Sequence, residues 1–314
     1  MNWKRIGFWT LSLIFLSVVS CRDRHFDRNV ARENWDGVIS SYGSNGKVST
    51  YGNCCLNIAL ARGGRLADEA FSFYQLGPGS LIPERDLRLK VVNEVLSDIM
   101  YEAGYVAEAR SSALEAEVIS SPGHNLRMIK RLVQTSLIYE DWAVAEKYIC
   151  FLEREGGKSF RRWARGQRCY LYNPEVLEAD SEYGEKRKCI PEDDFIPSNT
   201  VDDDLKKIIR ANPKHRNTVE ILGVWYLLKL DLKGFIGLLD EFYGTEALDA
   251  LPKSFAEAVC LIFDGDSSEV EKFGVSEVVL KRYRQFLSRM EAGLSLDAFD
   301  DTWWMYVARR SMLD

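Results

Sequence analysis

The chain has 314 residues, of which 46% are hydrophobic and 28% are charged, a balance typical of a globular protein. Its formal net charge is −6 and it has no basic tail, which disfavours nucleic acid as a partner because phosphate groups bind to basic surfaces. The sequence contains no Walker, dinucleotide-binding, HExxH or GxSxG pattern, so we expect no cofactor, no metal site and no catalytic residues.

The first twenty residues have the organisation of an export signal. Lys4 and Arg5 precede an apolar run over residues 6–19, and Ser20 and Cys21 follow it. As a helix this run spans roughly 21 Å, whereas the hydrocarbon core of a bilayer is about 30 Å thick. We therefore predict a signal peptide over residues 1–20 that is removed. The alternatives are an ordinary secretory signal with an incidental cysteine and a short uncleaved anchor.

Residues 18–21, Val-Val-Ser-Cys, resemble the lipobox of bacterial lipoproteins. The resemblance implies that Cys21 is acylated on its thiol and its amino group and becomes the first residue of the mature protein. Two or three acyl chains hold a protein on a membrane far better than one, since each buried methylene contributes about 0.8 kcal/mol. Arg22 is not the aspartate that retains many lipoproteins in the inner membrane. We therefore expect a cell-envelope protein on the outer membrane, facing the periplasm.

Helical hairpins are predicted over residues 21–172. Residues 102–109, Glu-Ala-Gly-Tyr-Val-Ala-Glu-Ala, resemble the turn and second-helix start of a tetratricopeptide repeat (TPR), and residues 64–70 and 139–145 repeat the pattern. Its helix-facing alanines stand about 39 and 36 residues apart, close to the 34 of that family: Ala70, Ala109 and Ala145. The resemblance implies an all-α fold, a right-handed α-solenoid of degenerate TPR-like helical hairpins.

A candidate binding face comes from the same resemblance. In tetratricopeptide proteins the first helix of each hairpin lines the concave surface, where a protein or peptide partner binds. Carrying these positions over selects a mostly polar set at about one-turn spacing: Glu94, Asp98, Tyr101, Glu102, Arg127, Lys130 and Gln134. The same pattern also describes a plain solvated face, and the sequence leaves that alternative open.

A basic segment over residues 158–168 stands out in this acidic protein. It includes Arg161, Arg162 and Trp163. One interpretation is a patch that binds anions or lipid headgroups. The other, which we favour, is a helix whose aromatic side chains enter the core and whose arginines pair with the acidic loop beside it. Cys150 and Cys260 lie in apolar helical runs, which predicts that both are small core residues.

Residues 173–200 contain three prolines and many charges, so we predict a charged loop or linker there. It divides the chain into an N-terminal helical block, residues 21–172, and a C-terminal helical block, residues 201–314. Cys169 and Cys189 flank this segment. A disulfide between them would contribute about 3 kcal/mol in the chain-entropy model, and the sequence leaves open whether they are bridged.

The C-terminal block has helical periodicity and ends in Trp303, Trp304 and Tyr306. A last helix must cover the exposed core of a helical stack, so we predict that these aromatic residues cap the fold. Docking on a membrane or a partner is the alternative.

The function expected from these features is that of a membrane-tethered envelope lipoprotein, a non-enzymatic scaffold that binds a protein or peptide. The alternative is a lipoprotein of an uptake system that binds a glycan or small ligand, and a hydrolase of unrecognised type ranks third. The lipobox, the hairpins and the Trp-rich last helix together also resemble an uncharacterised family of Bacteroidetes envelope proteins. That resemblance implies no particular activity.

Overall fold

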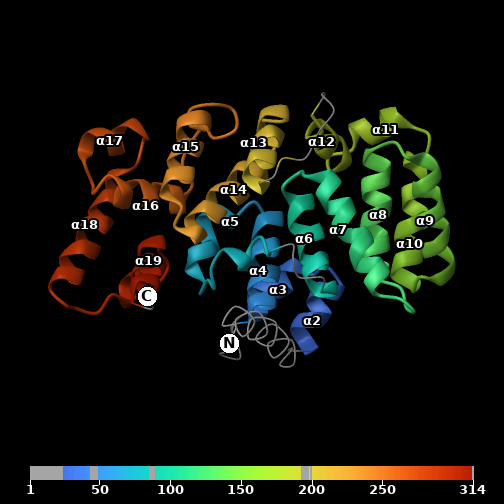
Figure 1. The fold of residues 1–314 in the computed structure, drawn as a ribbon, viewed down its shortest axis with the longest axis horizontal. Coiled ribbons are helices and arrows are strands. Elements are labelled where there is room, and N and C mark those ends of the chain that lie inside the picture. The colour runs from blue at the N-terminus through green and yellow to red at the C-terminus, as the bar shows by residue number, and fades with distance from the viewer. Residues whose placement is uncertain (1–23, 43–48, 85–88, 192–197, 199, 313–314) are drawn as a thin grey trace, which may run out of the picture.

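The computed structural model describes residues 24–42, 49–84, 89–191, 198 and 200–312 (Figure 1). These residues form helices joined by turns, and the described part of the chain contains no β-strand. The prediction of an all-α fold is confirmed. None of the described helices has both the length and the apolar character needed to cross a bilayer. The predicted signal over residues 1–20 and the lipidation site Cys21 lie outside the described residues.

The helices before residue 170 include the predicted hairpins. In chain order they are α2 (Arg24–Ala31), α3 (Trp35–Ser41), α4 (Thr50–Arg62), α5 (Leu66–Glu69), α6 (Lys90–Glu102), α7 (Val106–Ile119), α8 (Leu126–Ile138), α9 (Trp142–Glu155) and α10 (Lys158–Gln167). Short 3-10 turns follow α5, at Ala70–Ser72 and Pro78–Ser80, and α10, at Arg168–Tyr170.

The remaining helices carry the chain back and beyond its starting point. They are α11 (Pro174–Ala179), α12 (Tyr183–Lys188), α13 (Val201–Ala211), α14 (Arg216–Lys229), α15 (Leu232–Phe242), α16 (Lys253–Ile262), α17 (Ser267–Lys272), α18 (Glu277–Glu291) and α19 (Trp303–Ser311). A 3-10 turn at Asp297–Phe299 precedes α19.

Four hairpins share one turn geometry. A residue one or two positions after each first helix adopts a positive φ: 62° at Gly64, 74° at Gly104, 58° at Glu140 and 57° at Leu230. In each case the next N–H donates back to a carbonyl five residues earlier, for example from Tyr105 to Met100 at 2.8 Å. This is the left-handed cap that ends many helices. The repeated turn therefore has a structural basis even where glycine has been replaced.

The helices do not stack in simple chain order. Figure 1 shows α4 and α5 at the middle of the row, with α6–α10 on one side and α14–α19 on the other. The contacts agree, because α4 packs on α6 and on α14, while α5 packs on α14 and α16. The chain thus begins at the centre, builds one wing, returns through α12 and α13, and builds the other wing.

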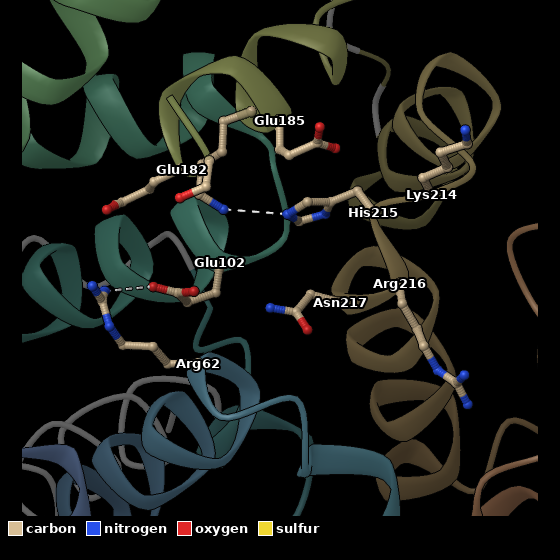
Figure 2. A pocket seen from close by; sticks show the side chains of 10 residues that line it. Arg62, Glu102, Glu182, Glu185, Lys214, His215, Arg216 and Asn217 are labelled. Carbon is tan, nitrogen blue, oxygen red and sulfur yellow. Dashed lines mark hydrogen bonds and ion pairs between the residues drawn. The ribbon is translucent and has the colours of Figure 1, made fainter. Parts of the chain in front are cut away.

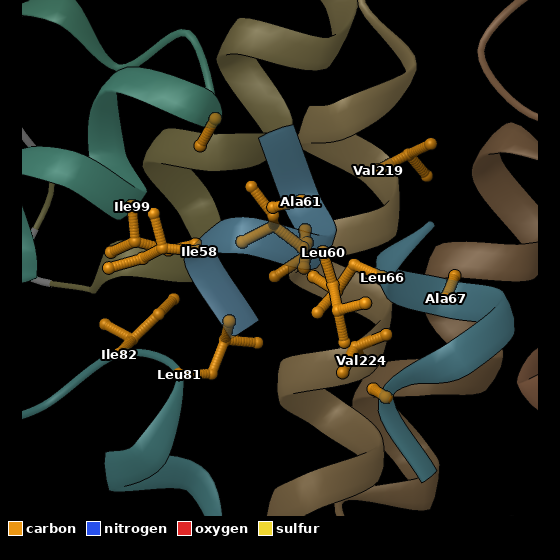
Figure 3. Close-up of a cluster of buried hydrophobic side chains, with 14 of the residues drawn as sticks. Ile58, Leu60, Ala61, Leu66, Ala67, Leu81, Ile82, Ile99, Val219 and Val224 are labelled. Carbon is orange, nitrogen blue, oxygen red and sulfur yellow. The ribbon is translucent and has the colours of Figure 1, made fainter. Parts of the chain in front are cut away.

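The central core is assembled from segments distant in sequence. Figure 3 shows side chains of α4 and α5, such as Leu60 and Leu66, in one cluster with Ile99 of α6 and Val224 of α14. All four are fully or almost fully buried. Burial of such a side chain stabilises a fold by about 1.5–3 kcal/mol, so this cluster holds the two wings together.

The segment over residues 173–200, predicted as a loop, is in part helical. Pro174 occupies the first turn of α11, where the missing N–H costs nothing, and the Asn173 side chain caps the helix by accepting from the Val176 N–H. In α12, Tyr183 and Lys186 are buried. The prolines and charges of this segment therefore indicate that the chain changes direction, not that it lacks helices.

The sequence left open whether Cys169 and Cys189 are bridged, and it predicted that Cys150 is buried, which is wrong. Cys169 and Cys189 are free thiols, the first exposed and the second buried against Asn212, so the structure contains no bridge between them. Cys150, predicted in the core, is exposed on α9, where Arg168 contacts its sulfur. Cys260 is buried as predicted.

The last helix caps the fold as predicted. Trp303 and Trp304 are buried, and their indole N–H groups donate to the carbonyls of Leu227 and Glu257. The Tyr306 hydroxyl donates to the carbonyl of Leu228 at 2.7 Å. The last carbonyls of a helix lack the usual partner within it, and α19 donates to two of them in α14, of which the Leu227 carbonyl also accepts from the Leu230 N–H.

Candidate functional site

The predicted binding face is closed. Asp98, 5% exposed, accepts hydrogen bonds from Arg127 and Arg131, and Glu94 also pairs with Arg127. Lys130 pairs with Glu33. The structure thus brings the predicted residues together, but as a buried ion-pair network between α6 and α8. The expectation that this face lines an open groove is wrong.

The chain itself covers the face. Glu33, just after α2, reaches Lys130, and Glu182, just before α12, accepts from the Tyr101 hydroxyl at 2.9 Å and from the Gln134 amide at 3.4 Å. Tyr101 is fully buried. Both covering segments are far from α6 and α8 in sequence, which is why repeat spacing alone did not reveal them.

Glu102 lies at the edge of this network and faces a pocket of about 400 Å³ (Figure 2). We call it the Lys186 pocket. Four segments line it: the end of α4, the end of α6, the α12 region and the start of α14. Its lining residues are Arg62, Glu102, Ser181, Glu182, Glu185, Lys186, Lys214, His215, Arg216 and Asn217.

Hydrogen bonds between distant segments fix the walls of the pocket. Thr218 Oγ1 donates to the Ala103 carbonyl at 2.9 Å, which fastens the start of α14 to the α6–α7 turn. The Asn212 amide donates to the Glu185 carbonyl at 3.0 Å and holds α12. At Gly104 a Cβ atom would stand 2.7 Å from the Cys189 sulfur, so only glycine allows α12 to approach this closely.

Lys186 is the central group of the pocket. Its ammonium nitrogen lies 3.3 Å from His215 Nε2 and 4.7 Å from the centre of the Tyr101 ring. Burial lowers the pKa of Lys186 because the charged form loses its hydration. Among the described residues, no carboxylate lies within 4.0 Å of this nitrogen.

His215 is positioned to accept from Lys186. Burial, together with the Lys186 charge, lowers the pKa of His215 to about 3, so its ring is neutral at neutral pH. Nδ1 lies 2.9 Å from Thr218 Oγ1, which itself donates to Ala103. We assign the proton to Nδ1, because Nε2 then accepts from the ammonium and Nδ1 donates to Thr218. His215 is the N-cap residue of α14.

The other cations of the pocket are already paired. Arg62 contacts Glu102 at 2.9 Å, Arg216 contacts Glu220 at 2.8 Å, and Lys214 contacts Glu246 at 3.5 Å. Within the described part of the pocket, Lys186 is therefore the cation that lacks a carboxylate. Lys186 lies in the segment predicted as a loop and no sequence motif surrounds it, so the sequence alone does not reveal this site.

The basic segment forms α10 and follows the favoured interpretation in part. Phe160 and Trp163 pack against the core, and Arg168 pairs with Glu153 of α9 at 2.8 Å. The partner is thus a neighbouring helix, not the acidic loop. Arg161 and Arg162 are exposed, so the patch interpretation remains a prediction for that outer face.

Metal binding has no visible basis in the described ranges, where no group of three or more His, Cys, Asp or Glu side chains could hold an ion.

Comparison with protein families gives one finding. The model of a family of unknown function, DUF6057, matches residues 10–310. No curated protein and no solved structure matches the chain.

Proposed function

The chain belongs to the DUF6057 family, a family of unknown function, and for it we propose the role of a lipid-anchored envelope protein that binds a protein or peptide partner without catalysis. The partner presents a carboxylate to the Lys186 pocket. One observation carries this proposal: a buried ammonium group lines an open pocket and has no carboxylate partner among the described residues.

A buried charge without an opposite charge beside it is costly. An ammonium group has three N–H donors, and in the described structure one of them is directed at His215. Removing an ion from water costs several kcal/mol unless an opposite charge and hydrogen bonds replace the water. A carboxylate at the end of a peptide, or on an Asp or Glu side chain, supplies both. The pocket of about 400 Å³ lies within the range of ligand sites.

A small ligand bearing a carboxylate is the second candidate. The observation that favours it is the closed face of α6 and α8, which leaves the Lys186 pocket without the long groove that an extended peptide would occupy. This corresponds to the uptake-system alternative.

The anchor is proposed from residues 18–21 and Cys21 alone. We propose acylation of Cys21 and an outer-membrane position facing the periplasm, in a bacterial envelope such as that of the Bacteroidetes. Metabolic labelling with a fatty-acid analogue tests the anchor: Cys21→Ala should lose the label. Cys169→Ala, which removes an exposed thiol, should keep it. Equal labelling of the Cys21→Ala protein would contradict acylation at that residue.

The binding proposal is tested by recovery of partners from detergent-solubilised envelope. Lys186→Met should lose the partners, while Lys188→Met, on the same helix but exposed and paired with Glu185, should keep them. N-acetylaspartate should release the partners more effectively than N-acetylasparagine, which has one carboxylate fewer. Unchanged recovery with Lys186→Met would refute the site. Recovery of no protein, together with a small acid retained by the wild-type chain in native mass spectrometry, would favour the second candidate.

A further inference from the structure

A smaller pocket of about 190 Å³ lies between the segment after α5 and the last helix, α19. It is separate from the Lys186 pocket and shares none of its residues. Phe71, Phe73, Tyr74 and Tyr306 supply its aromatic lining, and Arg309 and Arg310 supply its charges. We call it the Arg310 pocket.

Contacts with the core hold the aromatic walls in place. The Phe71 and Tyr306 rings pack with their centres 5.4 Å apart, and the Tyr306 hydroxyl is fixed by the Leu228 carbonyl at 2.7 Å. Phe73 packs edge-on against Tyr42 at 5.8 Å. Rings that are held in place lose little conformational freedom when a ligand binds, which lowers the entropic cost of binding.

The outer wall is more exposed. Tyr74 is 47% exposed, and its ring centre lies 5.9 Å from the guanidinium carbon of Arg309. Arg309 is itself paired with Asp300 at 2.7 Å. Arg309 is therefore already paired with a carboxylate, whereas, among the described residues, its neighbour Arg310 is not.

Arg310 is half-buried and has no carboxylate within 4.0 Å among the described residues. Its guanidinium lies against Gly77, where an added Cβ atom would stand 3.8 Å from Nη2 and 3.9 Å from Nη1. A guanidinium has five N–H donors in a planar fork that matches a carboxylate, and no described residue accepts from any of them. The pocket thus combines aromatic side chains with one guanidinium group, that of Arg310, which has no carboxylate partner among the described residues.

We propose that the Arg310 pocket binds a single aromatic ring that carries a carboxylate. The ring packs among Phe71, Phe73 and Tyr306, and the carboxylate accepts from the Arg310 guanidinium. The volume supports one ring, because an apolar cavity of about 150 Å³ accommodates benzene, and this pocket has about 190 Å³. This site does not depend on the function proposed above.

The test measures binding of benzoate to the full chain in detergent, by calorimetry and by saturation-transfer NMR. Benzoate should bind in a saturable way, and benzamide, which has the same shape without the charge, should bind at least about tenfold more weakly. Arg310→Met should weaken benzoate binding by about the same factor. Arg289→Met, an exposed change on α18, should leave it unchanged.

Arg310→Lys separates the fork from the charge, since lysine keeps the charge but cannot donate in a planar pair. Its affinity for benzoate should fall between those of the wild type and Arg310→Met. The melting temperature of each variant shows whether the pocket is intact. Equal affinity for benzoate and benzamide, unchanged binding by a folded Arg310→Met protein, or no binding of benzoate at millimolar concentration would overturn the proposal. Tighter binding of glucuronate than of benzoate would overturn the aromatic class.

Discussion

The hydroxyl oxygen of Tyr105 lies 2.8 Å from Oδ2 of Asp204, and this hydrogen bond joins the start of α7 to α13 across 99 positions. Asp204 is buried and also accepts from the backbone N–H of Ser198 at 2.7 Å. Through this contact the returning half of the chain is fastened to a hairpin of the first half.

Tyr105→Phe removes the donor and leaves a buried carboxylate with one partner fewer. A hydrogen bond to a charged group contributes about 1.5–3 kcal/mol, so the free energy of unfolding in urea should fall by that amount. Tyr172→Phe is the matched control, because the Tyr172 hydroxyl lies 3.3 Å from Glu146 and the side chain is 62% exposed. Equal effects of the two substitutions would mean that the Tyr105 bond adds nothing specific.

Asp98 is the shared partner of Arg127 and Arg131 in the closed face. Asp98→Asn leaves the buried Arg131 without a carboxylate and Arg127 with Glu94 alone, and breaking such a network costs about 3–5 kcal/mol. Thermal unfolding should therefore shift strongly downward. Glu155→Gln, which breaks an exposed pair with Arg154, should change stability by less than about 1 kcal/mol. An unchanged melting temperature for Asp98→Asn would restore the idea of a solvated face.

Ala109 is fully buried where α7 meets α6, and its carbonyl accepts from Ser97 Oγ at 2.9 Å. Ala109→Leu should overpack this contact and lower the free energy of unfolding by about 1–3 kcal/mol. Ala143→Leu, an exposed change on α9, is the control and should have little effect in the same chemical denaturation series. Equal tolerance of both leucines would contradict tight packing of α7 on α6 at Ala109.

Glu257 gives stability a dependence on pH. Its carboxylate accepts from the backbone N–H of Trp303 at 2.8 Å, and burial raises the pKa of Glu257 from 4.5 to about 7. Between pH 4.5 and 7 the folded protein binds more protons at this group than the unfolded chain does, so stability falls as pH rises through that window. The contribution is fully present below pH 4.5 and is lost above about pH 7.

Glu257→Gln keeps a neutral hydrogen-bonding group at this position at every pH. Its melting temperature relative to wild type should therefore rise from pH 5 to pH 8, where the wild-type carboxylate is charged. At about 1.36 kcal/mol per pKa unit the difference in unfolding free energy reaches up to about 3 kcal/mol. Glu291→Gln, an exposed change on α18, should show no such trend. A constant offset for Glu257→Gln would refute the raised pKa.

The features that sequence could predict are local. The Gly104 turn, the buried Ala109 and the buried Trp303 each follow from residue types within one hairpin or one helix, and the structure contains all three. A small residue at a helix crossing and an aromatic residue in a terminal helix leave a signal that does not depend on the rest of the fold.

The candidate site could not be predicted from such local patterns. Asp98 and Lys130 have the spacing of surface residues, and only the placement of Glu33 and Glu182 turns their face inward. Lys186 belongs to the candidate site because it contacts His215, 29 positions later, and no sequence periodicity connects the two residues. Contacts of this kind depend on where the chain returns, which a pattern of hairpins does not specify.

The position of α19 determines when some contacts of the fold can form during synthesis. Its Trp303 and Tyr306 satisfy carbonyls of α14, and Tyr306 packs on Phe71, close to the start of the chain. Synthesis delivers α19 after both α14 and Phe71, so in a nascent chain the Leu228 carbonyl and the Phe71 ring lack this partner until Tyr306 has emerged. A chain that stops before Trp303 would therefore lose the hydrogen bonds that α19 makes with α14 and the ring contact that it makes with Phe71.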